Sequence, residues 1–198
     1  MATGYENIYA SLLPRLSERD IAESAARLGL DMTEQGARVI FLRREYIISG
    51  KGVEPTDGEP TDVNNRSVLT HYILSDSAGD PSDEFVQLGR LVGSLDGQYN
   101  QSDEASIGIM VKEFGTDNEK LDAAVARLGG SKLPVSGKGK HVWALKPLPK
   151  IPMRIVKYDA DDEFPVDIQL LFDKTAPRYL NTETLGYLAR NLVLALAV

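Results

Sequence analysis

The sequence predicts a single α+β domain over residues 1–198, in which helices flank an antiparallel sheet and a C-terminal helix packs in the core. Three β-rich runs in the last third adjoin without helices between them, which favours antiparallel pairing over a doubly wound parallel sheet. Apolar residues at helical spacing recur along the rest of the chain and end in a leucine-rich C-terminal stretch. A chain of this length buries roughly 70% of its unfolded surface, so it needs neither disulfides nor metal to hold a core.

Two helices are expected at the N-terminus. A short one precedes Pro14, because proline disrupts the interior of a helix. Ser17 caps the second, and Asp20 completes a weaker form of the capping box. Gly29 ends this second helix, since glycine readily adopts the left-handed conformation found after a helix. Its apolar stripe consists of Ile21, Ala25 and Leu28.

A hairpin and a loop follow. Val39–Leu42 and Tyr46–Ile48 are β-rich runs on either side of the polar residues 43–45, which indicates two neighbouring strands. Residues 49–66 are rich in Gly, Pro, Asp and Asn, and we expect them to form an exposed acidic loop. The motif Glu-Pro-Thr-Asp occurs twice within it, which is typical of a small duplication in a surface loop.

The next segment predicts a helix, a strand and a loop. Asn65 or Ser67 caps the helix, which runs to Ser75. Phe85–Leu91 is β-rich and predicts a strand. Residues 93–101 are polar and contain several turn-forming residues, so a loop is expected there.

Two amphipathic helices come next. Ser102 starts the first, and Gly115 ends it. Residues 116–119 have the sequence Thr-Asp-Asn-Glu, which is a capping box for the second helix. The pair Gly129-Gly130 stops that helix.

The last third predicts three strands and a long helix. The third strand alternates apolar and polar residues, so one of its faces packs on the core. Asn181 caps the helix, and Leu180 and Leu185 form a hydrophobic staple across its first turn. The strands are His141–Leu148, Met153–Tyr158 and Val166–Phe172, and the helix buries Leu185, Leu188, Ala189, Leu192 and Leu196.

Composition excludes several classes of protein. The chain has 22 Lys and Arg against 29 Asp and Glu, a net charge of -7, which argues against binding to nucleic acid or to an anionic membrane. No apolar run reaches the ~18 residues of a membrane helix. The start has no basic segment before its apolar residues, so we expect a cytoplasmic protein rather than a secreted one. Without cysteine, thiol catalysis and thiolate metal sites are excluded.

The familiar catalytic motifs are absent from the sequence. Two features remain as candidate functional sites, and the first is an acidic turn. Asp159 and three further carboxylates fall between two predicted strands, and hard cations prefer such oxygen ligands. The turn lacks the glycine and distal glutamate of an EF-hand loop, so a solvated turn is the favoured interpretation. The alternative is a metal site, which Asp173 could join in space. Its ligands would be Asp161, Asp162 and Glu163.

The two histidines are the second feature. His71 lies beside Tyr72 on a predicted helix, and a neutral imidazole placed there can ligate the metal of a tetrapyrrole. A hydrogen-bonded, half-buried histidine is the alternative. His141 opens a strand next to Trp143 and is expected to be a plain strand-edge residue. Eight tyrosines, Tyr158 among them, indicate a ligand pocket or an interface, because each hydroxyl requires a partner.

Four segments resemble an uncharacterised family of domains of unknown function from anaerobic bacteria and archaea. They are residues 71–74 (His-Tyr-Ile-Leu), 128–130 (Leu-Gly-Gly), 148–152 (Leu-Pro-Lys-Ile-Pro) and the block 162–183. Some relatives carry an added iron–sulfur domain similar to that of corrinoid iron–sulfur proteins, whereas this chain has no cysteine and resembles the stand-alone form. The family commonly has Trp before the acidic turn, where this chain has Lys157-Tyr158. The resemblance implies anaerobic one-carbon or corrinoid-linked metabolism.

Three functions are therefore expected in order. The first is a small-molecule or cofactor-binding protein, with a corrinoid as the most specific ligand and His71, Tyr72, Trp143 and Tyr158 as its contacts. The second is an enzyme that uses the acidic cluster with His71. The third is a non-catalytic accessory protein with a protein partner or a second copy of itself. The oligomeric state is open.

Overall fold

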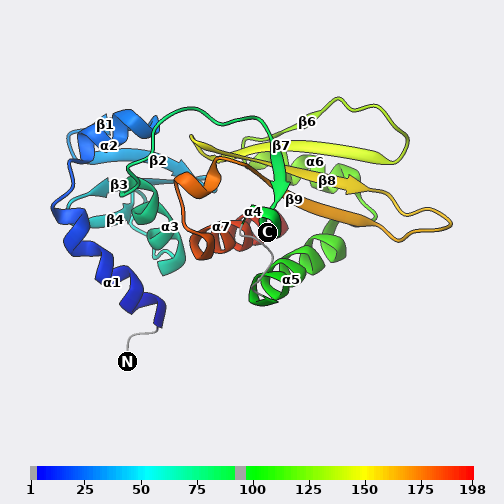
Figure 1. Ribbon diagram of the computed structural model, residues 1–198, viewed down its shortest axis with the longest axis horizontal. Helices are drawn as coiled ribbons and strands as arrows, with labels where there is room; N and C mark the ends of the chain where they lie inside the picture. Colours follow the sequence, from blue (N-terminus) through cyan, green and yellow to red (C-terminus); the bar gives the residue numbers. More distant parts are fainter. Residues whose placement is uncertain (1–3, 92–96) are drawn as a thin grey trace.

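A computed structural model describes residues 4–91 and 97–198 of the chain, and its side chains outside 97–104 (Figure 1). It confirms the α+β class, with antiparallel pairing throughout. The strands form two sheets rather than one: sheet A has the order β1-β2-β3-β4, and sheet B has the order β5-β9-β8-β7-β6. Sheet A lies at one end of the long axis with α1, α2 and α3, and sheet B lies at the other with α5 and α6 (Figure 1).

Sheet A is a meander whose central hairpin was predicted. Phe41 pairs with Arg44, so the turn consists of Leu42 and Arg43 alone instead of residues 43–45. Both turn residues have positive φ, 49° and 72°, as a two-residue turn matched to the twist of the strands requires. The strands are β1 (Asp31–Thr33), β2 (Gly36–Phe41), β3 (Arg44–Ser49) and β4 (Gly52–Pro55).

Strand β4 lies inside the segment 49–66 that was expected to be an exposed acidic loop. Gly52, Val53 and Pro55 are buried. The hydroxyl of Tyr9 accepts a hydrogen bond from the Val53 amide at 3.0 Å, which holds this edge strand against α1. Ser49 belongs to β3 and residues 63–66 begin α3, so only residues 50–51 and 56–62 of the predicted loop lie outside a strand or helix. The loop prediction was wrong for the rest.

The first three helices are α1 (Gly4–Ser17), α2 (Ile21–Leu28) and α3 (Val63–Ile73). Helix α1 continues through Pro14 to bury Leu16, so the proline does not end it. Asp20 caps α2 and Asp62 caps α3, in place of Ser17 and of Asn65 or Ser67. In both cases the capping residue is the aspartate directly before the first helical residue, and its carboxylate accepts an amide hydrogen bond from the first turn.

The middle of the chain differs most from expectation. The predicted strand 85–91 divides into β5 (Phe85–Gln87) and α4 (Leu88–Leu91). Part of the predicted loop, residues 93–96, lies outside the described residues, and α5 (Gly97–Phe114) begins well before Ser102. Asp117 rather than Thr116 caps α6 (Asn118–Arg127), because its carboxylate accepts the Lys120 amide at 2.8 Å. Gly129 has a φ of 77° and follows the helix end, as predicted.

Sheet B and the last helix follow the prediction closely. The strands are β6 (Ser131–Leu133), β7 (Lys140–Leu148), β8 (Ile151–Tyr158) and β9 (Asp167–Asp173). After the 3₁₀ turn η1 (Ala176–Arg178), Asn181 caps α7 (Thr182–Ala197) by accepting the Thr184 amide at 2.8 Å. Leu180 and Leu185 are both buried, as the staple requires.

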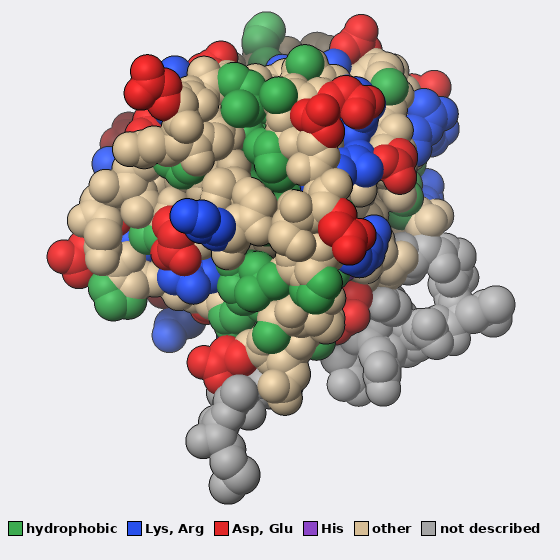
Figure 2. All heavy atoms as spheres, turned by 90° about the vertical axis from the view of Figure 1, so that its left-hand side faces the viewer, with side chains coloured by type: hydrophobic (Ala, Val, Ile, Leu, Met, Phe, Trp, Pro, Cys, Tyr) green, Lys and Arg blue, Asp and Glu red, His purple; other side chains and the backbone are tan. Residues whose placement is uncertain are grey.

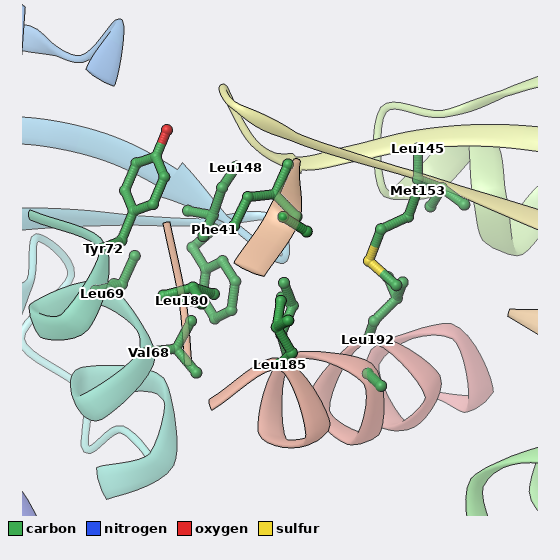
Figure 3. Close-up of a cluster of buried hydrophobic side chains, with 14 of the residues drawn as sticks. Phe41, Val68, Leu69, Tyr72, Leu145, Leu148, Met153, Leu180, Leu185 and Leu192 are labelled. Carbon is green, nitrogen blue, oxygen red and sulfur yellow. The ribbon is translucent and has the colours of Figure 1, made fainter. Parts of the chain in front are cut away.

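Helix α7 lies beneath both sheets and contributes to one continuous core (Figures 1 and 3). Figure 3 shows side chains from α3, β2, β7, β8 and α7 meeting there. On the face formed by α1, α2 and sheet A, acidic and basic side chains are mixed with apolar ones (Figure 2). Among the described residues, no helix is both long and apolar enough to cross a membrane.

Candidate functional site

A cavity of about 460 Å³ opens where the two sheets meet. Four elements line it: the β2–β3 turn, the end of β7, the end of α6 and the middle of α7. Because β2 contacts β7 and α6 contacts α7, the cavity lies at the junction between the two halves of the fold. Its lining residues are Ile40, Leu42, Arg43, Arg127, Leu128, Gly129, Leu145, Lys146, Pro147 and Leu192.

The inner wall of the cavity is apolar and rigid. Leu145 of β7 and Leu192 of α7 are 4% and 0% exposed, and Figure 3 shows both among the packed core side chains. Leu42 and Leu128 pack against this core from the turn and from the end of α6. Ile40 stands at the mouth and is 67% exposed. Apolar lining groups of this kind are typical of small-molecule sites.

Three cations stand among these apolar groups: Arg43, Arg127 and Lys146. No Asp or Glu is among the described residues that line the cavity. Nη2 of Arg127 donates hydrogen bonds to the carbonyl oxygens of Ala195 and Leu196, at 3.1 and 2.9 Å. The cavity is therefore positively charged in a protein whose net charge is -7.

Tyr72 was predicted to contact a cofactor, and the structure shows it in a structural position. It is fully buried. Its hydroxyl donates to the Leu28 carbonyl at 3.1 Å and accepts the Lys150 amide at 3.0 Å. Burial raises the pKa of Tyr72, so the phenol stays protonated. The residue ties the end of α2 to the β7–β8 turn.

His71 is half-buried on α3 and does not line the cavity. Burial lowers the pKa of His71, the positive charge of Arg15 lowers it further, and Glu183 acts in the opposite direction. The imidazole is consequently neutral at pH 7.

The four predicted contacts do not converge on one pocket. Trp143 is buried on β7, and its Nε1 donates to Asp122 at 2.6 Å. Tyr158 is 40% exposed at the end of β8. The Tyr72 hydroxyl contacts Lys150, before the start of β8, so the length of that strand, about 25 Å, separates it from Tyr158.

The acidic turn is held by its own backbone. Oδ1 of Asp161 accepts the amides of Glu163 and Phe164 at 2.9 and 2.8 Å, and these bonds lower the pKa of Asp161. Asp173 does not join the turn, because it ends β9 whereas the turn precedes the start of that strand. Its buried carboxylate instead accepts hydrogen bonds from Ser82, Asp83 and Thr175. Within residues 4–91 and 97–198 as described, no three His, Cys, Asp or Glu side chains are grouped for a metal ion.

The sequence analysis missed a polar cluster around His141. Oδ2 of Asp159 lies 2.8 Å from Nε2 of His141, and Nδ2 of Asn118 lies 3.1 Å from the same nitrogen. Nζ of Lys157 donates to Oδ1 of Asn118 at 2.7 Å and lies 3.3 Å from Asp159. The Lys157 side chain is only 1% exposed. The acidic turn thus meets His141, not His71.

The cluster includes one partly exposed pair, His141 and Asp159, whose side chains are 23% and 38% exposed. Hydrogen bonding, first from His141 and then from Lys157 and Asn118, lowers the pKa of Asp159 against the opposing effect of its partial burial. One signal in the sequence pointed to the pair. His141 begins one predicted strand and Asp159 follows the next, so an antiparallel hairpin brings them together.

The fold and the cavity define an α+β protein with a cationic, apolar-walled cavity between two antiparallel sheets. The chain belongs to the family described as Domain of unknown function (DUF3786), whose model matches residues 20–195. This confirms the resemblance to a family of unknown function over most of the chain. No curated protein and no solved structure matches it.

Proposed function

We propose that the protein binds a small molecule in the cavity between its sheets. The main support for this proposal is the size of the cavity. Its volume of about 460 Å³ lies within the range of roughly 300–1,000 Å³ that is typical of small-molecule sites. Such sites combine mainly apolar walls with a few polar groups that orient the ligand. Leu145 and Leu192 supply the walls here, and the three cations supply the polar groups.

The site is suited to binding without a large rearrangement. Its deepest groups belong to β7 and α7, which are packed in the core. Its mouth is formed by the two-residue turn Leu42–Arg43, whose conformation is set by the strand pairing on both sides. A preformed site loses less conformational entropy on binding than a flexible one.

Three eight-carbon probes with alkyl chains of similar length test this proposal: n-octanol, n-octylamine and octanoate. We expect at least one of them to bind saturably in isothermal titration calorimetry. Leu128→Trp fills the cavity and should remove that binding, as should Ile40→Trp at the mouth. Leu194→Trp is the matched control, because Leu194 is exposed on α7 and does not line the cavity. If none of the probes binds the wild-type protein, the proposal fails.

A corrinoid is the second and more specific candidate, supported by the family resemblance and by the neutral imidazole of His71. No His, Met or Cys is among the described residues that line the cavity, so these residues offer a corrinoid metal no ligand and do not fit it. Adding cobalamin decides the question. A visible spectral change that His71→Ala removes would support it, and neither spectral change nor retention at roughly 100 μM would end it.

The anaerobic setting and the cytoplasmic location belong to the same proposal. The first rests on the resemblance, and the second on the net charge of -7 and the lack of an apolar run long enough to cross a membrane. Purification of the protein under anaerobic conditions, followed by an absorption spectrum and native mass spectrometry, tests for a bound cofactor and gives the oligomeric state. A bound chromophore would favour the corrinoid candidate.

A further inference from the structure

We infer that the ligand of the cavity is an amphipathic anion, with a carboxylate or phosphate head on a compact apolar body. This inference rests on the proposed function and specifies the class of molecule that the site takes. It follows from the charges at the cavity mouth, the conformation of the β2–β3 turn and the lack of acidic groups among the described lining residues.

Arg43 and Lys146 form no ion pair with any described residue, whereas cations next to them in the sequence do. Arg44, the neighbour of Arg43, donates from Nε to Asp57 at 2.9 Å. Lys150 lies four residues after Lys146, in the turn between β7 and β8, and pairs with Asp80 at 2.8 Å. Lys146 acts on Asp80 only through its electrostatic field. Arg43 and Lys146 therefore have no competing carboxylate partner among the described residues, and both line the cavity.

Arg127 adds a third positive charge in a fixed position. Two of its hydrogen bonds run from a single atom, Nη2, to the end of α7. A guanidinium has five N–H donors in a rigid plane, so this anchoring leaves others for an acceptor inside the cavity. Its planar fork suits the paired oxygens of a carboxylate or phosphate.

The backbone at Arg43 supports the same conclusion. Leu42 and Arg43 have φ values of 49° and 72°, a region that non-glycine residues seldom adopt. Asn-Gly or Asp-Gly is the usual choice for such a turn. A non-glycine residue in this conformation lowers the stability of the fold, and residues in such conformations cluster at ligand sites. Here the conformation places a long cationic side chain at the mouth.

Selectivity follows from the contrast between the head groups. An anion gains charge-assisted hydrogen bonds from the three cations, which are stronger than those between neutral groups. An amine meets only like charge, and an alcohol gains neutral hydrogen bonds at most. The apolar body contributes equally in each case because the walls are the same.

Calorimetric titrations with octanoate, n-octyl phosphate, n-octanol and n-octylamine test the inference on the full chain. We expect at least one of the two anions to bind about tenfold more tightly than the alcohol, and the amine to bind most weakly. The tighter of the two anions identifies the head group. High salt should weaken anion binding and leave alcohol binding nearly unchanged.

The double variant Arg43→Gln with Lys146→Gln should reduce anion affinity about tenfold and octanol affinity by a much smaller factor. The control double variant Lys51→Gln with Arg154→Gln makes the same change of charge away from the cavity and should leave both unchanged. Alcohol binding that equals or exceeds anion binding would overturn the inference and keep the proposed function. If no probe binds, both fail.

Discussion

Nη2 of Arg127 donates a hydrogen bond to the carbonyl oxygen of Leu196 at 2.9 Å, so a cation in the cavity wall also satisfies the C-terminal end of α7. Helix α7 has no basic residue in its own last turn. The last carbonyls of a helix lack partners within it, and a cation near them is favourable. The cavity wall and the packing of α7 therefore depend on the same side chain.

Replacing Arg127 by Met should destabilise the fold by about 1–3 kcal/mol, because it removes charged hydrogen bonds to two carbonyl oxygens. Urea unfolding followed by circular dichroism measures the change. Arg178→Met is the matched control, since Arg178 is exposed and its side chain forms no hydrogen bond or ion pair with any described residue. Equal stability of the two variants would show that the link to α7 contributes nothing.

Helix α7 should be essential to the core. Leu188 is fully buried, and Leu188→Ala should cost about 2–5 kcal/mol of unfolding free energy. Leu194→Ala, on the exposed face of the same helix, should cost much less. Deleting residues 181–198 should leave unfolded or insoluble protein. A truncated chain with an unchanged melting transition would contradict this.

The pair of Asp159 and His141 should make stability depend on pH in the acidic range. The pKa of Asp159 is lowered in the folded protein, chiefly by its hydrogen bond from His141. The folded state therefore gains stability above the unfolded pKa of about 4, and loses it as pH falls through the folded pKa. Melting curves between pH 7 and 3 should show Asp159→Asn less stable than wild type at neutral pH, with the gap closing in acid.

Asp162→Asn is the control for that series. Asp162 is an exposed acid of the same turn, and its side chain forms no hydrogen bond or ion pair with any described residue. Its melting temperature should follow that of the wild type at every pH. A gap between Asp159→Asn and wild type that stays constant down to pH 3 would mean that the carboxylate charge is not what stabilises the cluster.

The acidic turn should not bind divalent cations tightly, because Oδ1 of Asp161 already accepts two backbone amides and no distant carboxylate of the described residues joins the turn. Titration with calcium, magnesium or manganese should leave the melting temperature nearly unchanged, since binding to the native state would raise it. A saturable rise abolished by Asp162→Asn with Glu163→Gln would show that the turn is a metal site.

The sequence predicted most elements and missed the site for a definable reason. The C-terminal strands and α7 were found because Ile168, Leu185 and their neighbours repeat at the spacing of one buried face. Helix starts were displaced where several capping residues compete, as Thr116 does with Asp117. The cavity was missed because Leu42, Leu128 and Leu192 come from distant parts of the chain, and only tertiary packing brings them together.

The most direct test of the account is an amide chemical-shift map of the ¹⁵N-labelled protein during titration with octanoate or n-octyl phosphate. We expect saturable shifts that cluster at residues 42–43, 127–129 and 145–146, the backbone around the cavity. In Arg43→Gln with Lys146→Gln the same shifts should need about tenfold more ligand to reach half-saturation. Shifts centred on Tyr158 and the acidic turn, or no saturable shifts at all, would contradict a binding site between the two sheets.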